Sequence, residues 1–123
     1  MNILLVFDPK TDCSAFKQTL QAHAGVGVTE ISDVDEALAA IKAGKADAVA
    51  VGEQVGDMEG VKFIEALVKV NPMVNTCLVS ALSKKDFHEV TEGLGVLMQL
   101  QTLPAREDAE RFIEKLRKVA SLM

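Results

Sequence analysis

The residues with the clearest chemical potential follow an apolar run, Ala48–Val51, near the middle of the chain. Gly52 and Glu53 come directly after this run, and Asp57 follows in the same short loop. In open α/β sheets, the carboxyl end of a strand is where ligands bind and reactions take place. The residue at this strand end, Gly52, has no side chain. The stretch therefore predicts a functional edge whose central position carries no reactive group.

Two polar residues end other apolar runs. Asp8 precedes Pro9, which is the pattern of a helix N-cap followed by proline in the first helical turn, and we favour this interpretation over a cation ligand. Ser80 is interpreted as a small polar strand end in preference to a group that holds an anion. Glu53 is one step beyond Gly52, and because side chains alternate along a strand we expect it to point elsewhere.

The histidines and cysteines form no catalytic or metal-binding pattern. His23 and His88 are far apart in sequence, near predicted helix ends, and neither has an acidic partner at catalytic spacing. Cys13 and Cys77 are too few for a disulfide framework and lack the spacing of metal ligands. We interpret both as free thiols in a reducing cytosol.

Five apolar runs alternate with five segments of helical periodicity. The predicted strands cover residues 2–7, 26–31, 48–51, 76–80 and 96–102. The predicted helices cover residues 10–23, a segment from a Ser32–Asp35 capping box to Gly44, Gly60 to Asn71, residues 84–92 after a Ser83 cap, and residues 105–121. This alternation predicts one α/β domain over residues 1–123, with a doubly wound parallel sheet between two helix layers. Its crevice would gather Phe7, Asp8, Gly52, Glu53, Ser80 and Leu103.

Composition argues against several functions. Hydrophobic residues make up 49% of the chain, which is enough to fill a core. The net charge of −5 disfavours nucleic-acid backbones and anionic membrane surfaces, and the absence of Trp and Tyr argues against base stacking. The apolar start, Met1–Val6, is too short for a signal sequence or a membrane span. We therefore expect a soluble, cytoplasmic protein that binds neither nucleic acid nor membrane.

In their order and spacing these segments resemble the receiver domain of bacterial response regulators, over the whole chain. Ile3 to Asp8 resembles the first strand of that family with its terminal acids, and Ala46 to Gly60 resembles its third strand, acceptor loop and following glycine. Further similar segments are Asp33–Leu38, Val79–Ala81 and Leu103-Pro104. The resemblance implies a flavodoxin-like (βα)5 three-layer sandwich with strand order 2-1-3-4-5, and a role in two-component or phosphorelay signalling.

The chemistry of this family uses an acceptor aspartate after strand three, two acids after strand one that help to hold magnesium, a hydroxyl after strand four and a lysine after strand five. In this sequence those positions carry, in that order, Gly52, Phe7 and Asp8, Ser80, and Leu103. Glycine cannot form an acylphosphate, a single carboxylate is a poor magnesium site, and leucine cannot neutralise a phosphoryl oxygen. The resemblance therefore implies a degenerate receiver without metal or cofactor, in which Asp8 is the one candidate magnesium ligand.

We accordingly expect a signalling module that acts by protein–protein interaction without phosphorylation, and not an enzyme. In the receiver family the partner surface is formed by the fourth helix, the fifth strand and the fifth helix. The residues that we single out on this surface are His88, Gln99, Gln101 and Arg106. The expected partner is another signalling protein, with a homodimer as an alternative.

Two other functions stay open. Glu53 or Asp57 could serve as a substitute phosphoryl acceptor. Alternatively, replacement of a charged cluster by Gly52 and Leu103 could leave a less polar cavity that takes a small ligand. The flavin of a flavodoxin is disfavoured, because the segment from Asp8 to Ser14 contains a proline and two acids and suits a phosphate badly.

Overall fold

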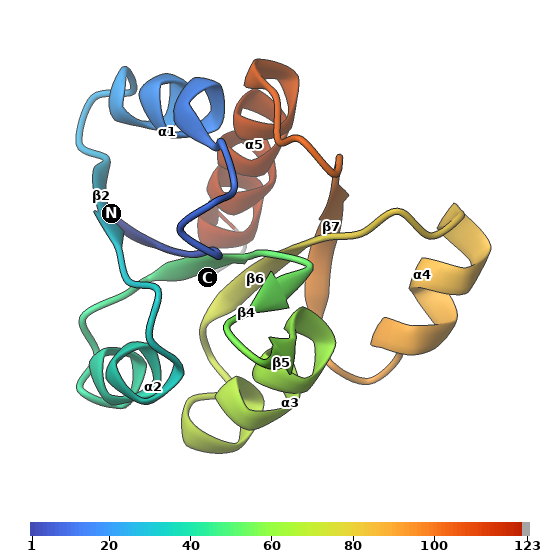
Figure 1. Ribbon diagram of the computed structural model, residues 1–123. Helices are drawn as coiled ribbons and strands as arrows, with labels where there is room; N and C mark the ends of the chain where they lie inside the picture. The colour runs from blue at the N-terminus through green and yellow to red at the C-terminus, as the bar shows by residue number, and fades with distance from the viewer. Residues whose placement is uncertain (122–123) are drawn as a thin grey trace.

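A five-stranded parallel sheet lies between two layers of helices in the computed structural model, which describes residues 1–121 (Figure 1). The spatial order of the strands is β2-β1-β3-β6-β7, which is 2-1-3-4-5 when only the strands of this sheet are counted. The flavodoxin-like α/β fold expected from the sequence is confirmed. The strands are β1 (Asn2–Val6), β2 (Gly27–Glu30), β3 (Ala48–Val51), β6 (Asn75–Val79) and β7 (Val96–Leu100).

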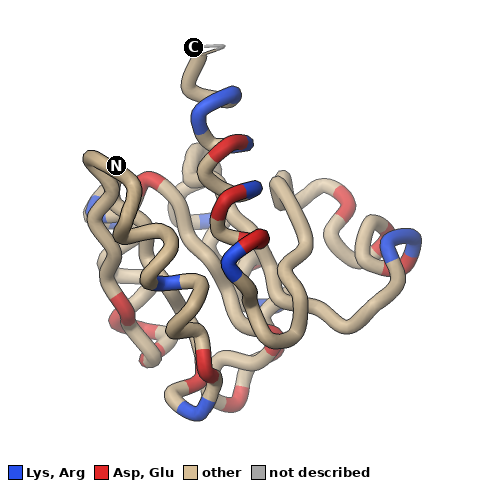
Figure 2. Tube along the Cα trace, turned by 90° about the horizontal axis from the view of Figure 1, so that it is seen from above, with Lys and Arg blue, Asp and Glu red and all other residues tan. Residues whose placement is uncertain are grey.

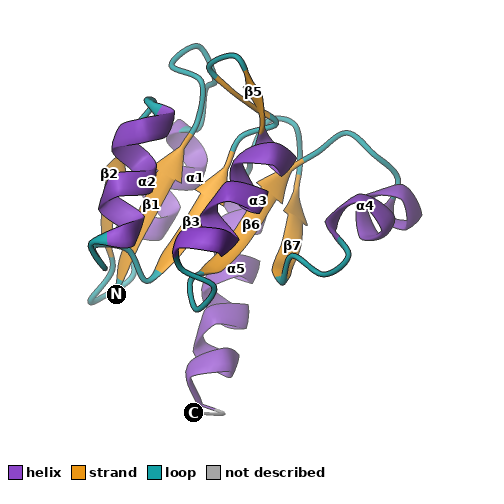
Figure 3. Cartoon of the chain, turned by 90° about the horizontal axis from the view of Figure 1, so that it is seen from below, coloured by secondary structure: helices purple, strands orange, loops and turns teal. Residues whose placement is uncertain are grey.

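Two helices cover each face of the sheet, and a fifth lies beside its β7 edge (Figure 3). Helices α1 and α5 cover one face, and α2 and α3 cover the other. No helix within residues 1–121 is both long enough and apolar enough to span a membrane. The helices are α1 (Ser14–Gln21), α2 (Val34–Lys42), α3 (Gly60–Val70), α4 (Lys84–Thr91) and α5 (Arg106–Ser121).

The core is divided into two clusters by the sheet. Alternate residues of β1 point to opposite faces, so Leu5 packs towards α1 and α5 while Val6 packs towards α2 and α3. Phe16 and Phe112 help to fill the first cluster, and Phe63 is the largest fully buried side chain of the second. All five of these residues are almost completely buried. This explains why β1 is apolar from Ile3 to Val6 instead of alternating between apolar and polar residues.

The first helix begins later than expected, and Asp8 does not cap it. Helix α1 starts at Ser14, and its N-cap position, Cys13, makes no side-chain capping hydrogen bond. The Asp8 carboxylate accepts a hydrogen bond from the Lys10 amide at 2.9 Å, and the Asp12 carboxylate accepts one from the Ser14 amide at 3.1 Å. Short acidic side chains that bond to nearby amides favour turns over helix, which delays the helix start.

The capping box predicted for the second helix is also wrong by one residue. The N-cap of α2 is Asp33, whose carboxylate accepts a hydrogen bond from the Glu36 amide at 2.8 Å. Ser32 and Asp33 are both good caps, and the sequence alone did not distinguish between them. The cap expected for α4 is present, because the Ser83 hydroxyl accepts a hydrogen bond from the Asp86 amide at 3.1 Å.

A small antiparallel hairpin follows β3, where the sequence predicted only a loop. It pairs β4 (Gln54–Val55) with β5 (Met58–Glu59) and lies at the top of the view in Figure 3. The turn between its strands contains Gly56, whose φ of +60° suits a residue without a Cβ. Asp57 is exposed at this turn. The hairpin therefore fixes the path of the chain between β3 and α3.

Candidate functional site

The carboxyl ends of the parallel strands meet at one edge of the sheet, which is uppermost in Figure 3. Strand register places Val6 beside Val51 and Val51 beside Leu78. The residues that follow these strands therefore lie at the same edge, and they include Phe7, Gly52 and Ser80. Leu103 lies in the loop that follows β7.

Phe7 occupies the space beside Gly52. A Cβ atom at Gly52 would lie 3.0 Å from Phe7 Cδ1 and 3.2 Å from the carbonyl oxygen of Gln54. The Phe7 ring is itself buried, and it meets the Phe16 ring edge-to-face with centroids 6.4 Å apart. Position 52 therefore carries no carboxylate, and a side chain there would press against the Phe7 ring.

Asp8 belongs to the turn after β1. Its carbonyl oxygen accepts a hydrogen bond from the Thr11 amide at 2.9 Å, while its carboxylate is bonded to the Lys10 amide. A cavity of about 240 Å³ lies beside it and is also lined by Phe7 and Glu30. Within residues 1–121, no three His, Cys, Asp or Glu side chains are arranged to hold a metal ion. The expectation that Asp8 does not serve as a magnesium site stays an untested prediction.

Glu53 reaches from the end of β3 to the end of β6. Its Oε2 atom accepts a hydrogen bond from the Ala81 amide at 2.8 Å. The alternation of side chains that guided our expectation applies only as far as Val51, where β3 ends. Beyond that point the Glu53 side chain turns across the edge of the sheet, to the residue that follows Ser80. The Ser80 hydroxyl accepts a hydrogen bond from the Leu82 amide at 3.1 Å.

Leu103 presents an apolar side chain to solvent at this edge. It is 63% exposed, whereas the neighbouring Pro104 is buried. The loop position at which the resemblance implies a lysine therefore carries no charge. The strand-end carboxylates that remain in the site are Asp8 and Glu53, and each is bonded to a nearby backbone amide.

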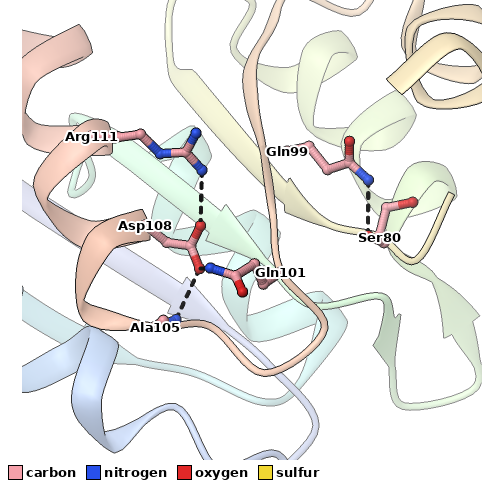
Figure 4. A network of polar contacts seen from close by, with 6 residues as sticks. All are labelled: Ser80, Gln99, Gln101, Ala105, Asp108 and Arg111. Atoms are coloured by element: carbon pink, nitrogen blue, oxygen red, sulfur yellow. Dashed lines mark hydrogen bonds and ion pairs between the residues drawn. The ribbon is translucent and has the colours of Figure 1, made fainter. Parts of the chain in front are cut away.

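The four candidate partner residues lie around α4, β7 and α5. Gln99 turns inwards: its side-chain amide donates to the carbonyl oxygen of Ser80 at 2.9 Å (Figure 4) and to that of Leu82 at 2.7 Å. His88 is exposed on α4, and Arg106 is exposed at the start of α5. A cavity of about 430 Å³ between α4, β7 and α5 is lined by His88, Gln99 and Gln101, but not by Arg106.

A fully buried carboxylate, Asp108, lies next to this cavity, and our sequence analysis missed it. It accepts hydrogen bonds from the Ala105 amide at 2.9 Å, from Gln101 Nε2 at 3.3 Å and from Arg111 Nη2 at 3.2 Å (Figure 4). A carboxylate at the third helical position that reaches back to the first amides is a common helix-start arrangement. Its place in the acidic first turn of α5 was the available signal.

Two buried thiols have raised pKa values. Burial raises the pKa of Cys77 well above its ordinary value, and the nearby Asp108 carboxylate raises it further. Burial also raises the pKa of Cys13, whose sulfur donates to Glu30 Oε1 at 3.6 Å. The hydrogen bond from Lys17, at 2.8 Å, lowers the pKa of the Glu30 carboxyl. Both cysteines are free and favour the protonated thiol, which is not a nucleophile.

The chain matches known proteins by structure and not by sequence. No sequence-family description matches it, and no curated protein does. It is similar to a CheY-like response regulator receiver domain protein from Methanospirillum hungatei, with a TM-score of 0.81 and 22% identity over 99% of this chain and 98% of that one. It is also similar to the receiver domain of the Francisella response regulator 1452, with a TM-score of 0.79 and 20% identity over 96% of this chain and 98% of that one.

A third similar structure is the signal receiver domain of a putative Luxo repressor protein from Vibrio parahaemolyticus. Its TM-score is 0.80 and its identity is 16%, over 98% of this chain and 92% of that one. At such low sequence identities the similarity shows a shared fold and nothing more. The chain therefore has the fold of CheY-like receiver domains along almost its entire length.

Proposed function

We propose that this chain is a receiver-like signalling module that acts by protein–protein interaction without phosphorylation. The observation that carries the proposal is position 52, where glycine supplies no carboxylate and a Cβ atom would lie only 3.0 Å from Phe7 Cδ1. The absence of a cation at Leu103 supports it, since a phosphoryl group there would lack a neutralising partner. The shared receiver fold supplies the signalling context.

The test is incubation of the purified protein with acetyl phosphate and magnesium, followed by intact-mass measurement. We expect no mass increase. A receiver domain that retains its acceptor aspartate, treated in parallel, provides the positive control. A gain of one phosphoryl mass would overturn the proposal, and peptide mapping would then show whether Glu53 or Asp57 carries the group.

Glu53 is the stronger of the two substitute acceptors, because its carboxylate lies at the strand edge next to the Ser80 and Ala81 backbone. In this second candidate function it would have to release the Ala81 amide before accepting a phosphoryl group. Glu53→Gln should abolish any mass gain if this residue is the acceptor. The small-ligand alternative has less support, since the Phe7 ring fills the space beside Gly52.

The surface proposed for partner binding is the α4–β7–α5 face. Its cavity has an apolar floor, which includes Phe87 and Met98, and each ionisable residue that lines it is basic: Lys84, His88 and Arg111. This contrasts with the net charge of −5 for the whole chain. The face is therefore suited to an acidic partner surface that offers an apolar side chain.

Charge reversal tests this surface. Lys84→Glu should reduce capture of a partner protein, measured as the recovery of the same protein by tagged wild type and variant at equal bait concentration. Lys62→Glu, at an exposed position of α3, is the matched control. Equal loss of capture in both variants would argue against a role for the α4–β7–α5 face. Sedimentation of the purified protein at several concentrations would show whether the face instead binds a second copy of this chain.

A further inference from the structure

The segment from Ser80 to Ser83, which joins β6 to α4, is held by a hydrogen bond at each residue. The Ser80 amide donates to the carbonyl oxygen of Leu100 at 3.2 Å, and the Leu82 amide donates to the Ser80 hydroxyl. The Gln99 side chain donates to the carbonyl oxygen of Ser80 (Figure 4) and to that of Leu82. The Ser83 hydroxyl caps α4. These bonds fix the segment to β7 and to α4.

Among the residues that the structure describes, Glu53 alone holds this segment by a hydrogen bond from the other side, where β3 ends. Its carboxylate accepts the Ala81 amide at 2.8 Å, and its own carbonyl oxygen accepts the Gly60 amide at 2.9 Å. Glu53 thus connects the end of β3, the start of α3 and the segment before α4. A hydrogen bond from an amide to an ionised carboxylate is shorter and stronger than one between neutral groups.

Helix α4 depends on this segment because its own packing is slight. Of its eight residues only Phe87 and Thr91 are buried. It lies at the β7 edge of the sheet, whereas α2 and α3 lie across the sheet face (Figure 3). A short helix with so small a buried stripe gains little from hydrophobic burial. Its position is therefore set largely by the chain that leads into it.

We propose that Glu53 is a positioning residue that permanently supplies a negatively charged group to the Ala81 amide, and so holds α4 in one position. In a receiver that is switched by phosphorylation, the phosphoryl group adds negative charge at this edge. Here a side chain of the folded protein provides it. The inference deepens the proposed function, on which its biological meaning rests: it explains how the α4–β7–α5 face keeps one conformation.

The test is amide hydrogen exchange measured residue by residue in the full chain. In Glu53→Ala the exchange of the Ala81 and Leu82 amides should rise about tenfold, the scale of one lost hydrogen bond, and the amides of α4 should follow. Asp57→Ala is the matched control, since that acid is exposed in the same loop, and it should leave these amides unchanged. Glu53→Gln retains an acceptor oxygen and should restore part of the protection.

Equal exchange at Ala81 in Glu53→Ala and Asp57→Ala would overturn the inference. An increase of similar size in the amide exchange of every strand would also overturn it, because that would report general destabilisation. Should Glu53→Ala fail to fold, Glu53→Gln still decides the matter, because equal exchange at Ala81 in Glu53→Gln and Asp57→Ala would overturn the inference. The measurement needs neither partner nor phosphodonor, so a failure here would leave the proposed function standing, and phosphorylation at Asp57 would overturn that function alone.

Discussion

At the scale of single residues, the large Phe7 side chain packs beside Gly52, which has no side chain, at the end of β3. A ring atom of Phe7 lies 3.0 Å from where the first atom of any side chain at position 52 would be. The same ring packs edge-to-face on Phe16 in the core between the sheet and α1, so it cannot swing aside without disturbing that contact. One buried contact therefore connects the hydrophobic core to the chemistry of the site.

This contact predicts the effect of restoring an acid. Gly52→Asp should lower the free energy of unfolding by about 1–3 kcal/mol, because the new side chain is forced against a packed ring. It should also gain no phosphoryl group from acetyl phosphate. Urea unfolding and intact-mass measurement check the two parts.

A second variant separates steric from chemical causes. In Gly52→Asp combined with Phe7→Ala, the space for the acid returns, and the cost of the single Gly52→Asp change should be partly relieved relative to Phe7→Ala alone. A double-mutant cycle that shows no coupling between these positions would contradict the steric account.

Asp108 gives a second prediction at this scale. Asp108→Ala should destabilise the fold by about 2 kcal/mol, because it leaves the Ala105 amide and the Gln101 side chain without their shared acceptor. The neighbouring Glu107, which is exposed, provides the control, and Glu107→Ala should cost less than about 0.5 kcal/mol. Similar losses in both variants would show that Asp108 acts only through its charge near the helix start.

At the scale of elements, the five helices and the five strands of the main sheet could be predicted from the sequence in type and order, but the β4–β5 hairpin and several boundaries could not. The runs in β1 and β3 are apolar on both faces, a pattern that few other structures produce. The starts of α1 and α2 depend instead on which of several nearby acids captures an amide, at Asp8, Asp12 and Asp33. Such competition is decided by local geometry that residue type does not contain.

The candidate site, like the fold, could be predicted from the sequence only in part. Parallel register brings the strand-end residues to one edge, so their assembly follows from topology alone. The reach of Glu53 to Ala81 does not, because it depends on where β3 ends and on the β4–β5 hairpin that redirects the chain. The inward turn of Gln99 was likewise hidden, since an alternating polar residue on an edge strand is equally compatible with exposure.

The junction of β3 with α3 supplies a prediction for these elements. A Cβ atom at Gly60 would collide with the carbonyl oxygen of Gly52 and would lie 2.7 Å from Leu78 Cδ1. Gly60→Ala should therefore destabilise the protein by about 1–3 kcal/mol, although alanine normally favours helix. Urea unfolding measures the change. Stability within about 0.5 kcal/mol of wild type would show that the helix start moves without cost.

At the scale of the whole molecule, charge is mixed along the surface. Acidic and basic residues alternate along α5, as Figure 2 shows from above, and the net charge of −5 is not concentrated in a single element. The pKa shifts that bear on stability instead belong to buried groups. The principal one is the Cys77 thiol, which is completely buried near Asp108.

Stability should therefore fall at alkaline pH. The folded-state pKa of Cys77 is raised, so its contribution is fully present below the ordinary thiol value of about 8.5 and is lost as pH rises towards the folded-state value. Over this range the free energy of unfolding should fall by up to about 1.4 kcal/mol per pH unit for this group. Urea unfolding at about pH 8 and about pH 10 measures the slope.

The slope of the free energy of unfolding against pH distinguishes the contribution of Cys77 from that of Cys13. Cys77→Ala should flatten the alkaline fall, and Cys13→Ala should flatten it less, because Cys13 is less deeply enclosed. An unchanged slope in Cys77→Ala would assign the alkaline loss to other groups.

The pairing of Phe7 with Gly52 at the end of β3 also opposes the introduction of an acid by a single substitution. An acid introduced at position 52 meets the Phe7 ring, and an acid introduced at position 7 replaces a buried ring by a charge and opens a void beside Gly52. Either single step passes through a less stable protein. A lineage that carries this pair would have to change both residues together to return to an acidic cleft.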